Sequence, residues 1–181
     1  MKQSTRSRKF KAILAGGAVL GVGAAVTLAA WSDDQAATGT FTTGTFALQS
    51  STDGTNWANN GQSAPATLAF DAGTLAPSDT VAAPFGLQVT GDYSADVTMS
   101  TSGTALTGLT YDLYEVGDAA ECTTGVAGDP VLTDSNLDTG TYNTTLDAGT
   151  PAFLCFVVTA SADLAQGASA STTWTFDAES K

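Results

Sequence analysis

The sequence contains no histidine among its 181 residues. It therefore has no H-E-x-x-H zinc motif, no serine–histidine pair and no ordinary catalytic zinc centre. A glycosidase that works with two carboxylates needs no histidine, but no pair of acids in this chain stands out from the general acidity. We therefore expect no enzymatic activity and assign no catalytic residues.

Basic residues are nearly absent beyond the first eleven positions. Five of the six lysines and arginines lie in residues 2–11, whereas all 18 acids follow residue 30. From residue 30 onward Lys181 is the one basic residue, so the net charge of that part is −17. A surface without cations cannot displace the counterions of nucleic acids or bind anionic lipid. Nucleic acids and anionic membranes are therefore excluded as partners.

A long, strongly apolar run is also missing. The basic start is followed by an uncharged stretch, residues 12–30, in the order typical of an export signal. Its four glycines and seven strongly apolar residues give only a marginal membrane span, about −2 to −4 kcal/mol before the glycines are counted. We therefore expect no permanent span, with a retained anchor as the alternative.

A cleavage site is predicted at the end of this stretch. Thr27, Leu28 and Ala29 have the small-x-alanine pattern that signal peptidases accept. We predict a signal peptide over residues 1–29 with Ala30 as the new N-terminus, and cleavage after Ala30 as the alternative. Signal peptidase would then be a transient partner and the product would be secreted, either extracellular or associated with the cell surface.

Cysteine is scarce, because the chain holds only Cys122 and Cys155. Both lie in the part predicted to be exported, where an oxidising compartment favours a disulfide. Closing this loop would stabilise the fold by about 3–4 kcal/mol in the entropic description. The alternatives are two buried thiols or a redox pair, although the spacing is not C-x-x-C.

The exported part lacks any long amphipathic helical stripe. It has instead short segments of strand-forming residues between turn signals, which predict an all-β domain. The segments are residues 40–50, 67–71, 81–90, 95–101, 109–116, 130–133, 151–160 and 169–178. Residues 151–160 are apolar on both faces, as in a central strand. About eight such strands predict an antiparallel β-sandwich of jelly-roll type, preceded by a cleaved signal helix.

One acidic turn has oxygen-bearing side chains at alternate positions. Asp134, Asn136 and Asp138 follow the spacing that calcium ligands use. Gly140 comes one place later than in an EF-hand loop, and no bidentate acid follows at the twelfth position. We expect an ordinary solvated turn, no metal site and no cofactor, with calcium binding as the alternative.

Four places in the sequence resemble a known family. They are TLA before WSD (27–29 and 31–33), TGTFTTGTF (38–46), LAPSD before FGLQV (75–79 and 85–89) and WTFDAE (174–179). Together they resemble the TasA and camelysin group of secreted proteins from Gram-positive bacteria, whose signals are removed by a SipW-type signal peptidase. Ser78 departs from the pattern, because the family has glycine there.

The resemblance implies a jelly-roll sandwich and, as in the best-known members, assembly into fibres of a biofilm matrix. In such fibres the N-terminal segment freed by cleavage becomes a strand of the neighbouring subunit. For this chain, residues 30–38 would be the candidate donor strand and residues 39–181 the β-sandwich domain. Trp31, Phe41 and Phe46 would be the assembly residues.

Two questions remain open at this point. Phe41 and Phe46 face opposite sides of a regular strand unless a bulge at Gly44 intervenes, and residues 40–50 are equally suited to begin the chain's own sandwich. The function favoured is a secreted structural subunit that self-associates through its N-terminal strand. The alternative is a monomeric exported module that binds glycan or protein at the cell wall or in the medium.

The predicted cleavage gives a direct expectation for the secreted protein. N-terminal sequencing should begin at Ala30, or at Trp31 if the alternative site is used. A sequence that begins upstream of Thr27 would contradict the assignment of the signal peptide.

Overall fold

The structure is a computed structural model that describes residues 37–70 and 75–181. The chain divides into two compact units, Met1–Phe41 and Thr42–Lys181. The described part of the first unit, residues 37–41, forms neither helix nor strand. The predicted signal peptide and its cleavage residues Thr27, Ala29 and Ala30 lie outside the described residues.

The second unit contains eight strands and one short 3₁₀ helix. These are β1 (Phe46–Ser51), β2 (Thr80–Gly91), β3 (Ala95–Gly103), β4 (Leu109–Val116), η1 (Ala119–Glu121), β5 (Leu132–Asn136), β6 (Thr141–Leu146), β7 (Ala152–Ala160) and β8 (Thr172–Ser180). Within the described residues no helix is long and apolar enough to cross a membrane.

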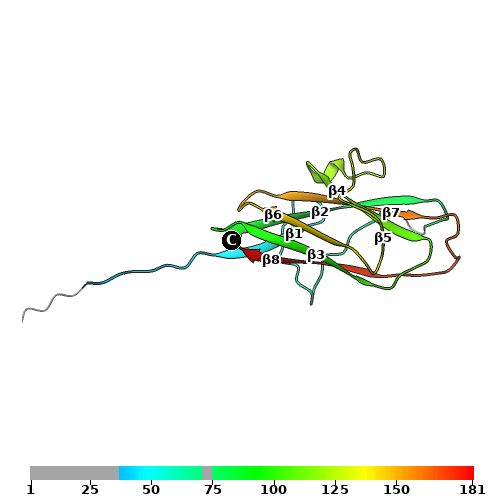
Figure 1. Cartoon of the computed structure of the whole chain (residues 1–181). Helices are drawn as coiled ribbons and strands as arrows, with labels where there is room; N and C mark the ends of the chain where they lie inside the picture. Colours follow the sequence, from blue (N-terminus) through cyan, green and yellow to red (C-terminus); the bar gives the residue numbers. More distant parts are fainter. Residues whose placement is uncertain (1–36, 71–74) are drawn as a thin grey trace, which may run out of the picture. The chain divides into compact units, whose positions relative to one another are not determined.

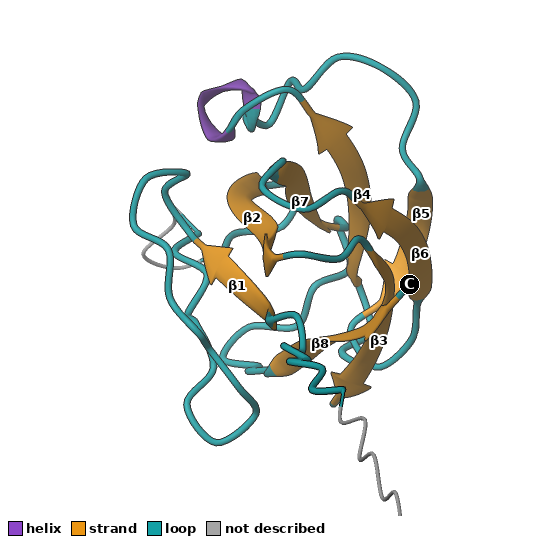
Figure 2. Ribbon diagram, turned by 90° about the vertical axis from the view of Figure 1, so that its left-hand side faces the viewer, coloured by secondary structure: helices purple, strands orange, loops and turns teal. Residues whose placement is uncertain are grey.

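The strands form two antiparallel sheets that face each other (Figures 1 and 2). One sheet has the order β1-β2-β7-β4-β5 and the other the order β6-β3-β8. The prediction of an all-β sandwich is therefore confirmed.

The core lies between the sheets and follows the two-residue alternation of the strands. Val97 and Met99 of β3 point inward and are buried, whereas Asp96, Thr98 and Ser100 on the other face are exposed. Tyr111 can be fully buried because its hydroxyl group has hydrogen-bond partners. It donates to the Thr139 carbonyl at 2.9 Å and shares a hydrogen bond with the Thr101 hydroxyl. Each large apolar side chain buried here stabilises the fold by about 1.5–3 kcal/mol.

The central strand β7 is covered on both faces, as its sequence predicted. Phe156 faces the core and Cys155 faces outward, yet both are fully buried. The Cys122–Cys155 disulfide is present, with 5.1 Å between the Cα atoms, and confirms the predicted pairing. It joins β7 to the segment around η1, on the side of this sheet away from β3 and β8 (Figure 2). The outer face of β7 is therefore covered by the chain's own loops.

Three strand predictions differ from the structure, and one of them is the omission of β6, which no predicted segment covers. Residues 67–70 form no strand, although Leu68 and Phe70 pack against the core. The first strand begins at Phe46 instead of residue 40, so Gly44 lies before the strand and makes no bulge within it. Glycine has weak strand propensity, and before Phe46 only Thr45 is still hydrogen-bonded to the residue that follows β2, Asp92. Phe46 is 37 % exposed and Phe41 is 95 % exposed.

The turn before β2 explains how the chain tolerates serine at position 78. Asp79 donates its N–H to the Ala76 carbonyl at 3.1 Å, with Pro77 and Ser78 at the two central positions. Ser78 has φ +72°, the left-handed conformation that the second central residue of a type II turn requires. A serine is strained there, which is why glycine is the usual residue.

We predict that Ser78→Gly stabilises the protein. Relief of the left-handed strain is worth about 1–2 kcal/mol, and the greater freedom of glycine in the unfolded chain removes about 0.4–1 kcal/mol of that gain. Urea unfolding should show a higher midpoint for Ser78→Gly than for Ser78→Ala, which keeps the strain. Equal midpoints for the two variants would contradict this explanation of the turn.

Candidate functional site

Two strand edges face the same side of the sandwich without a partner. Strand β1 pairs with Gly86–Gly91 of β2, so the first half of β2, Thr80–Phe85, pairs with none of the described strands on that side. Among the described strands β8 pairs only with β3, so its other edge is also free. Pro84 lies in the unpaired half of β2, as expected for a residue that cannot donate to a sheet.

A groove of about 800 Å³ runs between these two edges. Its walls come from β1, β2 and β8, and residues 60–68 and Phe70 form a rim. Five aromatic side chains line it, namely Phe70, Phe85, Phe156, Trp174 and Phe176. Of the described residues that line the groove, only Asp177 is charged. The site is thus an apolar groove beside a free strand edge.

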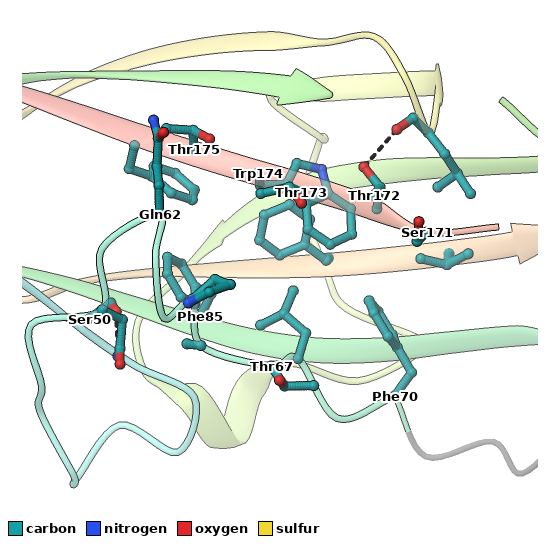
Figure 3. Close-up of a pocket in the computed structure, with 18 of the residues that line it drawn as sticks. Ser50, Gln62, Thr67, Phe70, Phe85, Ser171, Thr172, Thr173, Trp174 and Thr175 are labelled. Carbon is teal, nitrogen blue, oxygen red and sulfur yellow. Dashed lines mark hydrogen bonds between the residues drawn. The ribbon is translucent and has the colours of Figure 1, made fainter. Parts of the chain in front are cut away.

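The aromatic rings form a continuous packed surface. Phe156, which is fully buried, lies 4.4 Å from Trp174 between ring centroids and supports the floor of the groove. Phe85 stacks on Phe176 at 5.1 Å. Phe85 and Trp174 lie between the ribbons of β2 and β8, while Phe70 comes from the rim (Figure 3). An apolar occupant would therefore meet aromatic surface along the groove.

Strand β8 is held firmly at its start. The Thr172 hydroxyl donates to the Leu137 carbonyl at 2.6 Å and so ties β8 to the connection between β5 and β6. Gly103 permits this close packing, because a Cβ there would lie 2.5 Å from the Ser171 carbonyl oxygen. These contacts hold the start of β8, and with it the free edge of the strand, in a fixed position.

One polar atom beside the groove has no partner. The indole Nε1 of Trp174 is buried and finds no acceptor among the described residues. Its ring meets Tyr111 edge to face, with 5.4 Å between the centroids. A buried N–H without an acceptor is uncommon in proteins, so hydrogen-bonding capacity remains unused at this position.

A salt bridge between Lys181 and Asp96 lies at the C-terminal end of β8. Lys181 Nζ lies 2.6 Å from an Asp96 carboxylate oxygen, and the hydrogen bond from Lys181 lowers the pKa of that carboxyl below its usual value. Thr145 also donates to Asp96, at 2.8 Å. These groups lie at the outer face of the three-stranded sheet, so the only lysine beyond residue 30 is not in the groove.

The predicted assembly and calcium residues lie elsewhere. Trp31 is outside the described residues, Phe41 belongs to the first unit, and Phe46 begins β1. Asp134 and Asn136 are in β5, and Asp138 is in the following turn. The Asp134 N–H donates to Asp112 at 2.7 Å. In the described ranges no three acids or cysteines come together as metal ligands.

The groove was not predicted from the sequence, although a strand was predicted in each of its walls. Trp174 and Phe176 are two positions apart in the last strand and so share one face, which the structure turns inward. The pattern gave no sign that Phe70 and Phe85 would join them, because this depends on which strands lie at the sheet edges.

What the groove can do follows from its two kinds of surface. Aromatic walls bind apolar side chains, while the unpaired backbone groups of β8 and β2 accept an extended chain by strand addition. No family model and no curated protein matches this chain in the comparisons made. The functional proposal therefore rests on the groove.

The floor and the rim of the groove should respond differently to mutation. Phe156→Ala leaves a cavity in the core and should cost about 3–5 kcal/mol of unfolding free energy. Phe70→Ala removes a partly buried ring at the rim and should cost about 1 kcal/mol. Chemical denaturation of both variants measures this, and equal losses would contradict the placement of the two rings.

Proposed function

We propose that the protein is a secreted structural subunit that assembles into extracellular or cell-surface fibres. In this proposal the N-terminal segment of one subunit fills the groove of the next as an added strand. The observation that carries the proposal is the apolar groove lying beside the unpaired edge of β8. The resemblance to TasA and camelysin proteins and the predicted export signal agree with it.

The shape of the groove favours an extended chain as its occupant. Strand β8 has nine residues, so a strand along its edge would extend over about 30 Å. An added strand satisfies the backbone N–H and C=O groups of that edge, while alternate side chains enter the groove. A small compact ligand would cover the aromatic rings and leave the strand edge unpaired.

The N-terminal segment has the pattern that such an occupant needs. On an extended strand Ala37, Gly39 and Phe41 share one face, and Thr38 and Thr40 share the other. One face is thus small or aromatic and the opposite face is polar, as in a half-buried strand. Residues 35–41 carry no charge, so this last part of the segment could enter the groove without burying an unpaired charge, whereas Asp33 and Asp34 would have to lie outside it.

In this proposal two different surfaces meet: the N-terminal segment of one subunit and the groove of the next. A contact between unlike surfaces leaves a free donor on one subunit and a free groove on another. Such a contact propagates into a filament unless the rotation between subunits closes a ring. A fibre therefore needs no second kind of subunit in its body.

A second candidate function rests on the same groove. Its volume of about 800 Å³ falls within the range of sites that bind small molecules. A monomeric exported module could therefore use it for an apolar or peptide ligand of another source. The two candidate functions differ in polymerisation: the structural subunit polymerises, and the binding module stays monomeric.

The decisive experiment compares the chain from Ala30 to Lys181 with the unit Thr42–Lys181, which contains the core and the disulfide. Negative-stain microscopy should show fibres for the longer chain and none for the shorter one. A synthetic peptide of residues 30–41 should bind the shorter chain, and a scrambled peptide of the same composition should not.

Each other outcome has a defined meaning for this proposal. Fibres in neither sample would favour the monomeric binding module. Fibres in both samples would refute strand donation and leave the structural role in place. Equal binding of both peptides would show that the groove does not distinguish the sequence of the segment from a scrambled one.

A further inference from the structure

The turn between β2 and β3 holds both ends of the sandwich. Phe46, the first residue of β1, pairs with Gly91, and Ser180 at the end of β8 pairs with Ala95. The backbone N–H of Lys181 donates to the Ser94 carbonyl at 2.9 Å. The start of β1 and the end of β8 therefore lie at the same end of the sandwich.

Thr45, just before β1, is fixed to this turn by three hydrogen bonds. Its N–H donates to an Asp92 carboxylate oxygen at 2.8 Å, and its hydroxyl donates to the same oxygen at 3.3 Å. Its carbonyl accepts from the Asp92 N–H at 3.0 Å. These bonds extend the pairing of β1 with β2 by one residue, so the backbone at Thr45 stays in line with β1.

Two glycines allow the contact to be this close. A Cβ at Gly44 would lie 2.3 Å from the ring of Tyr93, which therefore packs directly on the Gly44 backbone. Gly91 has φ +114°, and a Cβ there would lie 2.1 Å from the Thr45 carbonyl oxygen. A side chain at Gly91 would meet the Thr45 backbone, and one at Gly44 would displace the Tyr93 ring. We call Gly44, Thr45, Gly91, Asp92 and Tyr93 the mount.

We propose that the mount keeps the N-terminal segment out of its own groove and so reserves the groove for a neighbouring subunit. This inference rests on the proposed function, because it concerns the same groove and the same segment. It adds a reason why the subunits assemble instead of closing on themselves.

The direction of β8 provides the argument. Strand β8 runs toward the β2–β3 turn and ends there. To enter its own groove, the segment before residue 42 would have to reverse direction within a few residues and lie parallel to β8. At Thr45 the backbone is held in line with β1 and points out of that end of the sandwich, so the direction fixed by the mount is opposite to the one that this reversal requires. A neighbour farther along the same axis would receive it antiparallel to β8, the slightly more stable pairing.

The mount biases the competition between the two arrangements. A hydrogen bond from an amide to an ionised carboxylate is among the stronger kinds. A difference of about 1.4 kcal/mol changes an equilibrium tenfold. Removing the mount should therefore shift the competition for the groove by about tenfold toward the chain's own segment.

The test measures how open the groove is in the monomer. Fluorescently labelled peptide 30–41 is titrated into the chain from Ala30, below the concentration at which it assembles. The variant Asp92→Ala/Tyr93→Ala should bind the peptide about tenfold more weakly than the parent, because its own segment competes. Its fibres should also form more slowly.

Two controls isolate the mount from the groove. The same two substitutions in Thr42–Lys181, which lacks the segment, should leave peptide affinity unchanged. Asp112→Ala removes a comparable carboxylate–amide bond, to Asp134 on β5, and should also leave it unchanged. Circular dichroism melting verifies folding, and Asp92→Asn provides a milder variant if the double substitution does not fold.

The outcomes separate this inference from the proposed function. If the peptide fails to bind parent Thr42–Lys181, the proposed function falls, and the inference falls with it. If the peptide binds the parent and the mount variant of the long chain equally, the mount has no such role and strand donation stands. A weaker affinity in the short mount variant would also overturn the inference, because the substitutions would then act on the groove.

Discussion

The early end of β1 is the constraint on which the open side of the sandwich depends. Ser51 is almost fully buried, and its hydroxyl accepts the Gly54 N–H at 3.0 Å, so the chain turns away from β2 there. Asp53 fixes the turn: hydrogen bonds from the Asn56 backbone and side chain, and from Thr55, lower the pKa of its carboxyl. The pairing with β2 therefore stops at Gly86. A longer β1 would have covered Thr80–Phe85 and removed one wall of the groove.

Where β1 ends, an aromatic pair covers the outer face of β2 at Gly86. A Cβ at Gly86 would lie 2.9 Å from the ring of Trp57 and 3.1 Å from the ring of Phe153. Trp57 and Phe153 pack at 6.1 Å between ring centroids on the outer face of the sheet. The absence of a side chain at Gly86 thus lets an aromatic pair seal the outer face, while the inner face at Phe85 stays accessible from the groove. The two faces of β2 differ because of these few residues.

The sequence allowed most of the strands and the disulfide to be predicted, but neither β6 nor the groove. The doubly apolar stretch at residues 151–160 identified β7 as central, because that signal is local. The predicted strand at 67–71 failed because Leu68 and Phe70 bury apolar surface from a loop, which local pattern cannot distinguish from a strand. A free edge is a property of strand order, and strand order depends on pairings between residues far apart in the chain, such as Ser102 with Thr173.

An open strand edge carries a risk of non-specific association, and the charge pattern limits that risk. Unpaired edges join non-specifically when they are flat and apolar. Here the part of the chain beyond residue 30 carries a net charge of −17, so two sandwiches repel each other on approach. Residues 35–45, which are rich in threonine and small residues, carry no charge and escape that repulsion, and the two acids of the segment, Asp33 and Asp34, precede them. Selective entry of one segment, with general repulsion between the domains, is what distinguishes ordered assembly from aggregation.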